Sequence, residues 1–116
     1  MKAAIAKLIF QVHRLPEHEN KFEFDEQVIV LSGDSQETQV KEALNWAYGY
    51  EAENNLVPSD GLRWEFIGIR ELIPFHLGGQ ALPLCSGSLF MEEDTSFIEH
   101  IRLKSRALEN TLPLFS

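Results

Sequence analysis

Cysteine is almost absent from this chain of 116 residues. Its one cysteine, Cys85, has no partner for an intrachain disulfide, which fits a reducing compartment such as the cytoplasm. A single cysteine within an apolar strand is typical of a small buried side chain, and nucleophilic catalysis would need a histidine next to it in space. The sequence therefore excludes a disulfide-stabilised scaffold and predicts a cytoplasmic location.

Long hydrophobic runs are also missing. A membrane-spanning helix needs about 20 predominantly apolar residues, and no segment approaches that length. The first ten residues faintly resemble a signal peptide, but Lys7 interrupts the apolar run and no small-residue cleavage site follows before His13. We expect no membrane association.

Positive charge is scarce, with 10 lysines and arginines against 18 aspartates and glutamates and a formal net charge of −8. Such a surface repels a phosphate backbone, and the aromatic residues do not alternate with basic ones as in an RNA-stacking surface. Residues 95–116 carry a net charge of +1, which leaves −9 on residues 1–94. We expect no nucleic-acid partner, whereas a basic protein would suit this acidic surface.

Motifs for metals, cofactors and catalysis are absent. His13 and His18 show neither the helical i, i+4 spacing of a zinc site nor a nearby pair of cysteines. The Leu77-Gly-Gly79 turn is neither a dinucleotide fingerprint nor a phosphate loop, and Ser86-Gly-Ser88 lacks the flanking glycines of a nucleophile elbow. The sequence thus predicts no catalytic residue, no metal and no cofactor, which favours a non-enzymatic protein.

The periodicity of apolar residues predicts the element order ββαββα. Strands are expected over residues 3–12, 22–31, 62–72 and 84–91, with irregular structure or a ragged sheet edge over residues 73–83. The first two strands are joined by a short polar loop, which predicts an antiparallel hairpin.

Two helices are predicted between and after these strands. Asp34 and Glu37 form a candidate capping box for a helix over residues 35–53, which carries an apolar stripe at Val40, Ala43, Leu44 and Ala47. A second helix is expected to begin at Ser96. Its apolar stripe comprises Ile98, Ile101, Ser105, Leu108 and Leu112, and a short hydrophobic tail follows.

These elements predict a single α+β domain over residues 1–116, with a mainly antiparallel sheet of about four strands and two helices on one face. The first three strands carry aliphatic residues at both parities, so the second face of the sheet must also be covered. We expect either the chain's own C-terminal elements or another subunit to cover it. Self-association as a homodimer is the main prediction.

Polar residues within the apolar pattern are the candidate site residues. Glu26 interrupts the apolar parity of the second strand, so its carboxylate must be paired, protonated or at a sheet edge. Arg63 or Arg70 on a neighbouring strand is a natural ion-pair partner. The alternative is a ligand pocket between the first helix and the sheet. The residues that would form the ion pairs or this pocket are Glu26, Trp46, Tyr50, Arg63, Trp64 and Arg70.

Apolar residues do not keep to one parity along the third predicted strand. Trp64 and Phe66 share a parity with Gly68, whereas Ile67 and Ile69 lie on the opposite parity. Either Gly68 allows a β-bulge that swaps the faces, or the strand is central and covered on both sides. We expect a core strand.

Three short motifs give the chain a resemblance to a bacterial family. They are Ala6-Lys7-Leu8 in the opening strand, the acidic pair Asp25-Glu26, and the Trp-x-Phe-x-Gly strand from Trp64 to Gly68. In these the chain resembles the domain-of-unknown-function family 4288 over about residues 3–75, with residues 84–116 outside the likeness. The resemblance implies a small α+β architecture and lends no catalytic residues.

Three functions remain open from the sequence. The first is a self-associating interaction module without enzymatic activity. The second is an immunity- or antitoxin-like inhibitor of a basic protein, which the acidic surface would serve by electrostatic complementarity. The third is a small-molecule-binding protein that uses the pocket between the first helix and the sheet.

Overall fold

The structure is a computed structural model that describes residues 2–14, 22–56, 61–76, 86–92 and 96–110. The elements run in the chain order β1, β2, α1, β3, β4, α2. Their bounds are β1 Lys2–His13, β2 Phe22–Leu31, α1 Gln36–Leu56, β3 Arg63–His76, β4 Ser86–Glu92 and α2 Ser96–Glu109.

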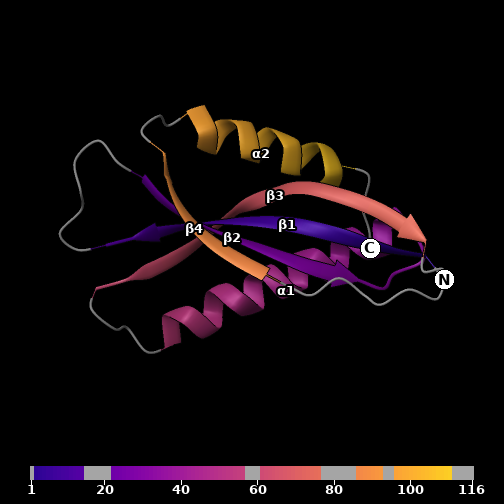
Figure 1. Cartoon of the computed structure of the whole chain (residues 1–116), viewed down its shortest axis with the longest axis horizontal. Coiled ribbons are helices and arrows are strands. Elements are labelled where there is room, and N and C mark those ends of the chain that lie inside the picture. The colour runs from indigo at the N-terminus through magenta and orange to yellow at the C-terminus, as the bar shows by residue number, and fades with distance from the viewer. Residues whose placement is uncertain (1, 15–21, 57–60, 77–85, 93–95, 111–116) are drawn as a thin grey trace.

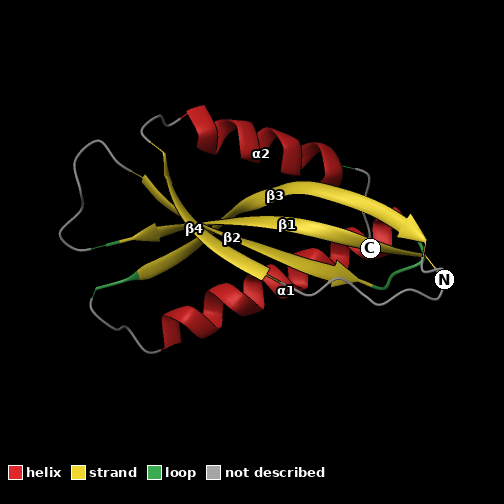
Figure 2. Ribbon diagram, in the orientation of Figure 1, coloured by secondary structure: helices red, strands yellow, loops and turns green. Residues whose placement is uncertain are grey.

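The strands form one antiparallel sheet with the order β3-β1-β2-β4 (Figure 2). β1 pairs with β2 along almost its whole length, with Phe10 opposite Asp25 and Ile5 opposite Val30. This confirms the predicted hairpin of the first two strands. β1 also pairs with β3, and β2 with β4, so β1 and β2 occupy the centre.

An α+β fold with two helices and an antiparallel sheet is confirmed. Two alternatives that the sequence left open are decided. β3 continues to His76, so residues 73–76 belong to a sheet edge and are not irregular; Pro74 is tolerated there because β3 is an edge strand, where a missing N–H breaks no ladder bond. The edge position also excludes a central strand, whereas the buried side chains of Ile67 and Ile69 agree with the expected core strand.

The two helices lie on opposite sides of the sheet, with α1 below and α2 above it in Figure 1. The prediction that both helices pack on one face is therefore wrong. The physical reason is the two-sided apolar pattern of β1, which has to be covered on both faces. Neither helix in the described part of the chain has the length and apolar character needed to cross a membrane.

The larger core lies between α1 and the sheet. β1 contributes Ala4, Ala6, Leu8 and Phe10, all inaccessible to solvent. The predicted stripe of α1 is confirmed, since Val40, Ala43 and Ala47 are fully buried in this core. The capping residue is one position later than predicted: the Ser35 hydroxyl, not the Asp34 carboxylate, accepts the Thr38 N–H at 3.2 Å.

The smaller core lies between α2 and the other face. Its buried members are Ile9, Phe24, Ile67 and Ile101, with Phe97 and Ile98 of α2 packed against them. The Phe24 and Phe97 rings meet edge to face, with centroids 4.7 Å apart. The chain's own C-terminal helix therefore covers part of the second face, which is one of the two outcomes predicted.

β3 contains two register shifts against β1, and these explain its irregular alternation. At the first shift, Lys7 lies opposite Glu71 and Leu8 opposite Ile69, so Arg70 has no partner residue on β1. At the second shift, Ile9 lies opposite Gly68 and Phe10 opposite Phe66, so Ile67 has no partner residue on β1. Bulges of this kind change which residues share a face. The predicted bulge at Gly68 is confirmed by the shift beside it.

The outer edge of β3 is closed by side chains from both helices. Asn55 of α1 accepts the Trp64 N–H at 2.9 Å and donates to the Trp64 carbonyl at 2.9 Å, and Glu51 accepts the Phe66 N–H at 2.6 Å. The Ser105 hydroxyl of α2 accepts the Ile69 N–H at 2.8 Å. Free backbone groups on an edge strand invite pairing with another chain, and these bonds prevent it over residues 64–69.

Gly68 allows α2 to approach the sheet. A Cβ atom at this position would lie 2.6 Å from the Ser105 Cβ and 3.3 Å from the Ile101 carbonyl oxygen. The Ser105 Cβ cannot move away, because it belongs to a buried helix position whose hydroxyl bonds to the β3 backbone.

We predict that Gly68→Ala destabilises the protein by about 1–3 kcal/mol through overpacking of α2 against β3. Gly49→Ala is the matched control, since a Cβ at Gly49 meets nothing within 4 Å. Because Gly49 lies inside α1, that change should stabilise by about 0.5–1 kcal/mol. Urea denaturation followed by circular dichroism measures both, and equal effects of the two changes would contradict the close contact.

Candidate functional site

Among the residues that the structure describes, the buried charged side chain is Asp25 of β2, which is 4% exposed. Its carboxylate accepts three hydrogen bonds: from the Tyr50 hydroxyl at 2.6 Å, from the Trp64 indole N–H at 3.1 Å and from the Gln27 amide at 2.7 Å. The donors come from α1, β3 and β2, so Asp25 joins three elements. All three donors are neutral, and hydrogen bonds replace the water that the carboxylate loses on burial.

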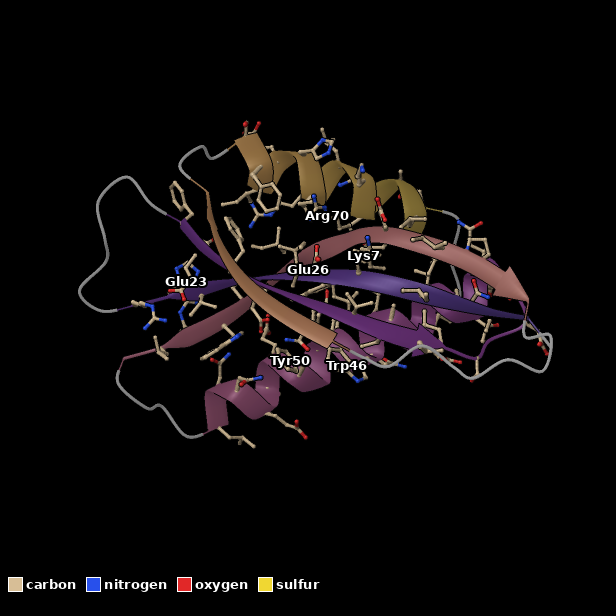
Figure 3. All side chains as sticks on the ribbon, in the orientation of Figure 1. Lys7, Glu23, Glu26, Trp46, Tyr50 and Arg70 are labelled. Atoms are coloured by element: carbon tan, nitrogen blue, oxygen red, sulfur yellow. The ribbon has the colours of Figure 1, made fainter. Side chains whose placement is uncertain are left out.

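Aromatic rings enclose this carboxylate on the α1 side of the sheet. The Tyr50 ring stacks on Trp46 with centroids 5.0 Å apart and an interplanar angle of 14°, and it tilts against Phe10 at 4.7 Å. Trp46 and Tyr50 are labelled on the α1 side in Figure 3. Three residues of the predicted pocket between the first helix and the sheet, Trp46, Tyr50 and Trp64, thus lie together around Asp25.

Tyr50 is held in its protonated form. Burial of the ring raises the pKa of the Tyr50 hydroxyl well above its usual value, and the hydrogen bond to Asp25 and the negative charge of Asp25 raise it further. The hydroxyl is therefore a permanent donor to the carboxylate at all physiological pH values.

Sequence reasoning did not select Asp25 as a site residue, because Glu23, Asp25 and Gln27 share one parity of β2 and together form a polar row. The signal against that interpretation was available further along the strand. Ile29 and Leu31 have the same parity as Asp25 and are buried in the α1-side core. A strand face that continues in two aliphatic residues is a core face, so its acidic member needs buried donors.

Glu26 lies on the opposite face and pairs with Arg70 at 2.8 Å. The predicted ion pair with Arg70 is thus confirmed, although the two strands are not neighbours, since β1 lies between them. The Arg70 guanidinium lies 5.9 Å from the centre of the Phe97 ring, which adds a cation–π contact with α2. Figure 3 shows Glu26 and Arg70 on the α2 side of the sheet.

The structure separates the six candidate site residues into two groups and leaves one outside both. Trp46, Tyr50 and Trp64 surround Asp25, and Glu26 and Arg70 form the ion pair on the other face. Arg63 is exposed at the beginning of β3, opposite His13. The sheet itself separates the two groups, so the six residues do not form one site.

No group of three histidine, cysteine or carboxylate side chains within the described ranges could hold a metal ion. A carboxylate oxygen of Glu65 accepts a hydrogen bond from the His13 Nε2 at 2.9 Å. Cys85 and His18 lie outside the described residues, as do the predicted loop over 77–83 and the tail.

A row of aliphatic side chains crosses the α2-side face of the sheet beyond the ion pairs. Ile5 of β1 lies opposite Val30 of β2 and opposite Ile73 of β3, so these three residues form a straight row, which we call the aliphatic row. Ile73 is 43% exposed, whereas Ile5 and Val30 are half-buried. Within the described residues, none of the three belongs to either core cluster.

A pair of opposite charges lies beside the aliphatic row. Lys7 of β1 and Glu71 of β3 face each other in register and form an ion pair of 3.3 Å. Their side chains are 35% and 43% exposed, so both remain accessible to another molecule. The row and this pair together make an amphipathic surface on an otherwise acidic protein, which is the candidate functional site.

Comparisons with known proteins give no match to any family model, curated protein or solved structure. The resemblance to the domain-of-unknown-function family 4288 therefore stays a prediction. The function has to be inferred from the arrangement of residues in this chain.

The donor role of Tyr50 leads to a prediction about alkaline pH. Tyr50→Phe removes one of the three donors to Asp25 and should lower the free energy of unfolding by about 1–3 kcal/mol at neutral pH. Above about pH 10 tyrosine ionises in the unfolded chain but not at the native Tyr50, so the wild-type protein loses stability as the pH rises. The gap in stability between wild type and Tyr50→Phe should therefore narrow between about pH 9 and 11.

Urea denaturation at a series of pH values measures this gap. Trp64→Phe serves as the control, because it removes a donor to Asp25 that does not ionise, so its gap should not change with pH. A gap that stays constant up to pH 11 would show that the native Tyr50 ionises like an unfolded tyrosine.

Proposed function

We propose that this protein is a non-enzymatic interaction module that self-associates through the aliphatic row. The observation that carries the proposal is the alignment of Val30, Ile5 and Ile73 across three strands, with Ile73 43% exposed. An accessible row of aliphatic side chains on a sheet face is typical of a protein contact. The reducing conditions suited to a single cysteine favour the cytoplasm as the place where this happens.

A second copy of the chain fits this surface for an electrostatic reason. In a twofold-symmetric contact, the same patch meets itself. If the axis runs parallel to the strands, midway between β1 and β3, Lys7 of one copy meets Glu71 of the other, because the two residues lie opposite each other in register. The surface therefore carries its own complementary charges.

We propose a non-enzymatic role because the acidic side chains in the interior of the described residues are bonded within the fold. Asp25 is occupied by three donors within the fold, and Glu26 is occupied by Arg70. Both acidic side chains thus stabilise the fold through hydrogen bonds to other residues of the chain.

The net charge sets the conditions for association. Each copy carries −8, so two copies repel each other at low ionic strength. At about 0.1 M salt the screening length falls to about 10 Å, which weakens this repulsion but leaves apolar contacts intact. Self-association should therefore strengthen as salt is added.

We predict that size-exclusion chromatography with light scattering shows a dimer whose population rises between about 20 mM and 300 mM salt. Ile73→Glu should abolish it, because a carboxylate would be buried without a partner at the centre of the contact. Leu103→Glu is the matched control: Leu103 is 64% exposed on α2, and this change adds the same charge away from the row. A strict monomer at about 1 mM protein, or equal effects of both changes, would overturn the proposal.

A further inference from the structure

A cleft of about 520 Å³ lies where the two helices meet the edge of β3. Phe66 and Ile67 of β3 line it, together with Tyr48 of α1 and several polar residues of α2. The Tyr48 and Phe66 rings meet edge to face, with centroids 5.4 Å apart. The volume is within the range of small-molecule sites, which is about 300–1,000 Å³.

Two arginines and one glutamate line the cleft, and Glu51 and Glu65 lie close to it. Arg102 and Arg106 are one helical turn apart on α2, so they lie on the same side of the helix, and both line the cleft. The acidic side chain in its lining is Glu109. The lining therefore carries one net positive charge within a chain whose total is −8.

The donors of this cleft are available for a ligand. Arg102 has only a long contact of 3.7 Å with Glu65, and Glu65 is also bonded to His13 at 2.9 Å. Among the described residues, the side chains of Arg106, Tyr48 and Asn110 have no hydrogen-bond or ion-pair partner. Guanidinium, phenol and amide groups thus line one cleft, and those of Arg106, Tyr48 and Asn110 have N–H or O–H donors without a partner in the described part of the chain.

The nearby carboxylates are occupied with closing the edge of β3. Glu109 accepts the Ser105 hydroxyl at 2.9 Å, and Glu51 accepts the Phe66 N–H at 2.6 Å. Burial, and then the charges of Glu109 and Glu51, raise the pKa of Tyr48, so its hydroxyl stays a donor. The lining side chains without a partner among the described residues are therefore donors, and the Glu109 carboxylate lies beside them as an acceptor.

We infer that this cleft binds a small aromatic molecule that carries an oxyanion group. The oxyanion would accept hydrogen bonds from Arg102 and Arg106, whose guanidinium groups suit the geometry of carboxylate and phosphate. The ring would lie against Tyr48 and Phe66, which offer an edge and a face for aromatic contact. This site is separate from the aliphatic row and does not depend on self-association.

Titration of the ¹⁵N-labelled full-length chain with phenyl phosphate, followed by amide chemical shifts, tests the inference. We expect saturable shifts confined to Tyr48, Phe66 and residues 102–110, with a dissociation constant of about 1 mM, as suits a ligand of this size. Inorganic phosphate carries the oxyanion without the ring, and benzyl alcohol carries the ring without the oxyanion. Both should bind more weakly than phenyl phosphate. Benzoate distinguishes a carboxylate preference from a phosphate preference.

Arg106→Gln should weaken phenyl phosphate about tenfold, the effect of losing one charge-assisted hydrogen bond. Lys104→Gln is the matched control, because it removes the same charge from an exposed position of α2 that does not line the cleft. It should change the affinity by less than about twofold. Equal weakening by the two changes would reveal nonspecific attraction to α2 and overturn the site, as would shifts that spread over the surface or do not saturate.

Discussion

The contact between Ser105 and Gly68 determines how the rest of the structure is arranged. Ser105 occupies the space that any larger residue at Gly68 would need, and its hydroxyl accepts the neighbouring Ile69 N–H while donating to Glu109. α2 is thereby fixed both against the sheet and against the open edge of β3. Without this contact the apolar side chains of Ile9, Phe24 and Ile67 would have to be covered by another molecule.

The position of α2 also decides which surfaces remain accessible. Its first turns cover the end of the sheet face that carries Phe24, and Arg70 lies at the border of this covered region through its contacts with Glu26 and Phe97. Beyond that border come the Lys7–Glu71 ion pair and the aliphatic row. The surface proposed for self-association is thus the part of the second face that α2 is too short to reach. The cleft has the same origin, because it lies between α2, α1 and the β3 edge.

Much of the fold could be predicted from the sequence, because the apolar periods of the strands and of α1 are regular. Val40, Ala43 and Ala47 marked the buried face of α1, and Glu26 marked an ion pair with Arg70. The placement of the helices could not be predicted, since a two-sided strand pattern does not say whether a helix or another subunit covers each side. Asp25 was missed for a related reason: a polar residue between polar neighbours looks solvated until tertiary contacts bring Tyr50 and Trp64 to it.

The acidic surface restricts where a second copy can bind. Repulsion between two chains of charge −8 acts over the screening length, about 8 Å at physiological salt, and it opposes contact through any face with unpaired acidic groups. Apolar burial acts only at contact, so it outweighs the repulsion only where aliphatic side chains are aligned and charges are balanced. The aliphatic row meets both conditions, because Lys7 and Glu71 contribute no net charge beside it. In the proposed dimer, the same charge that keeps other faces apart would therefore direct association to this one.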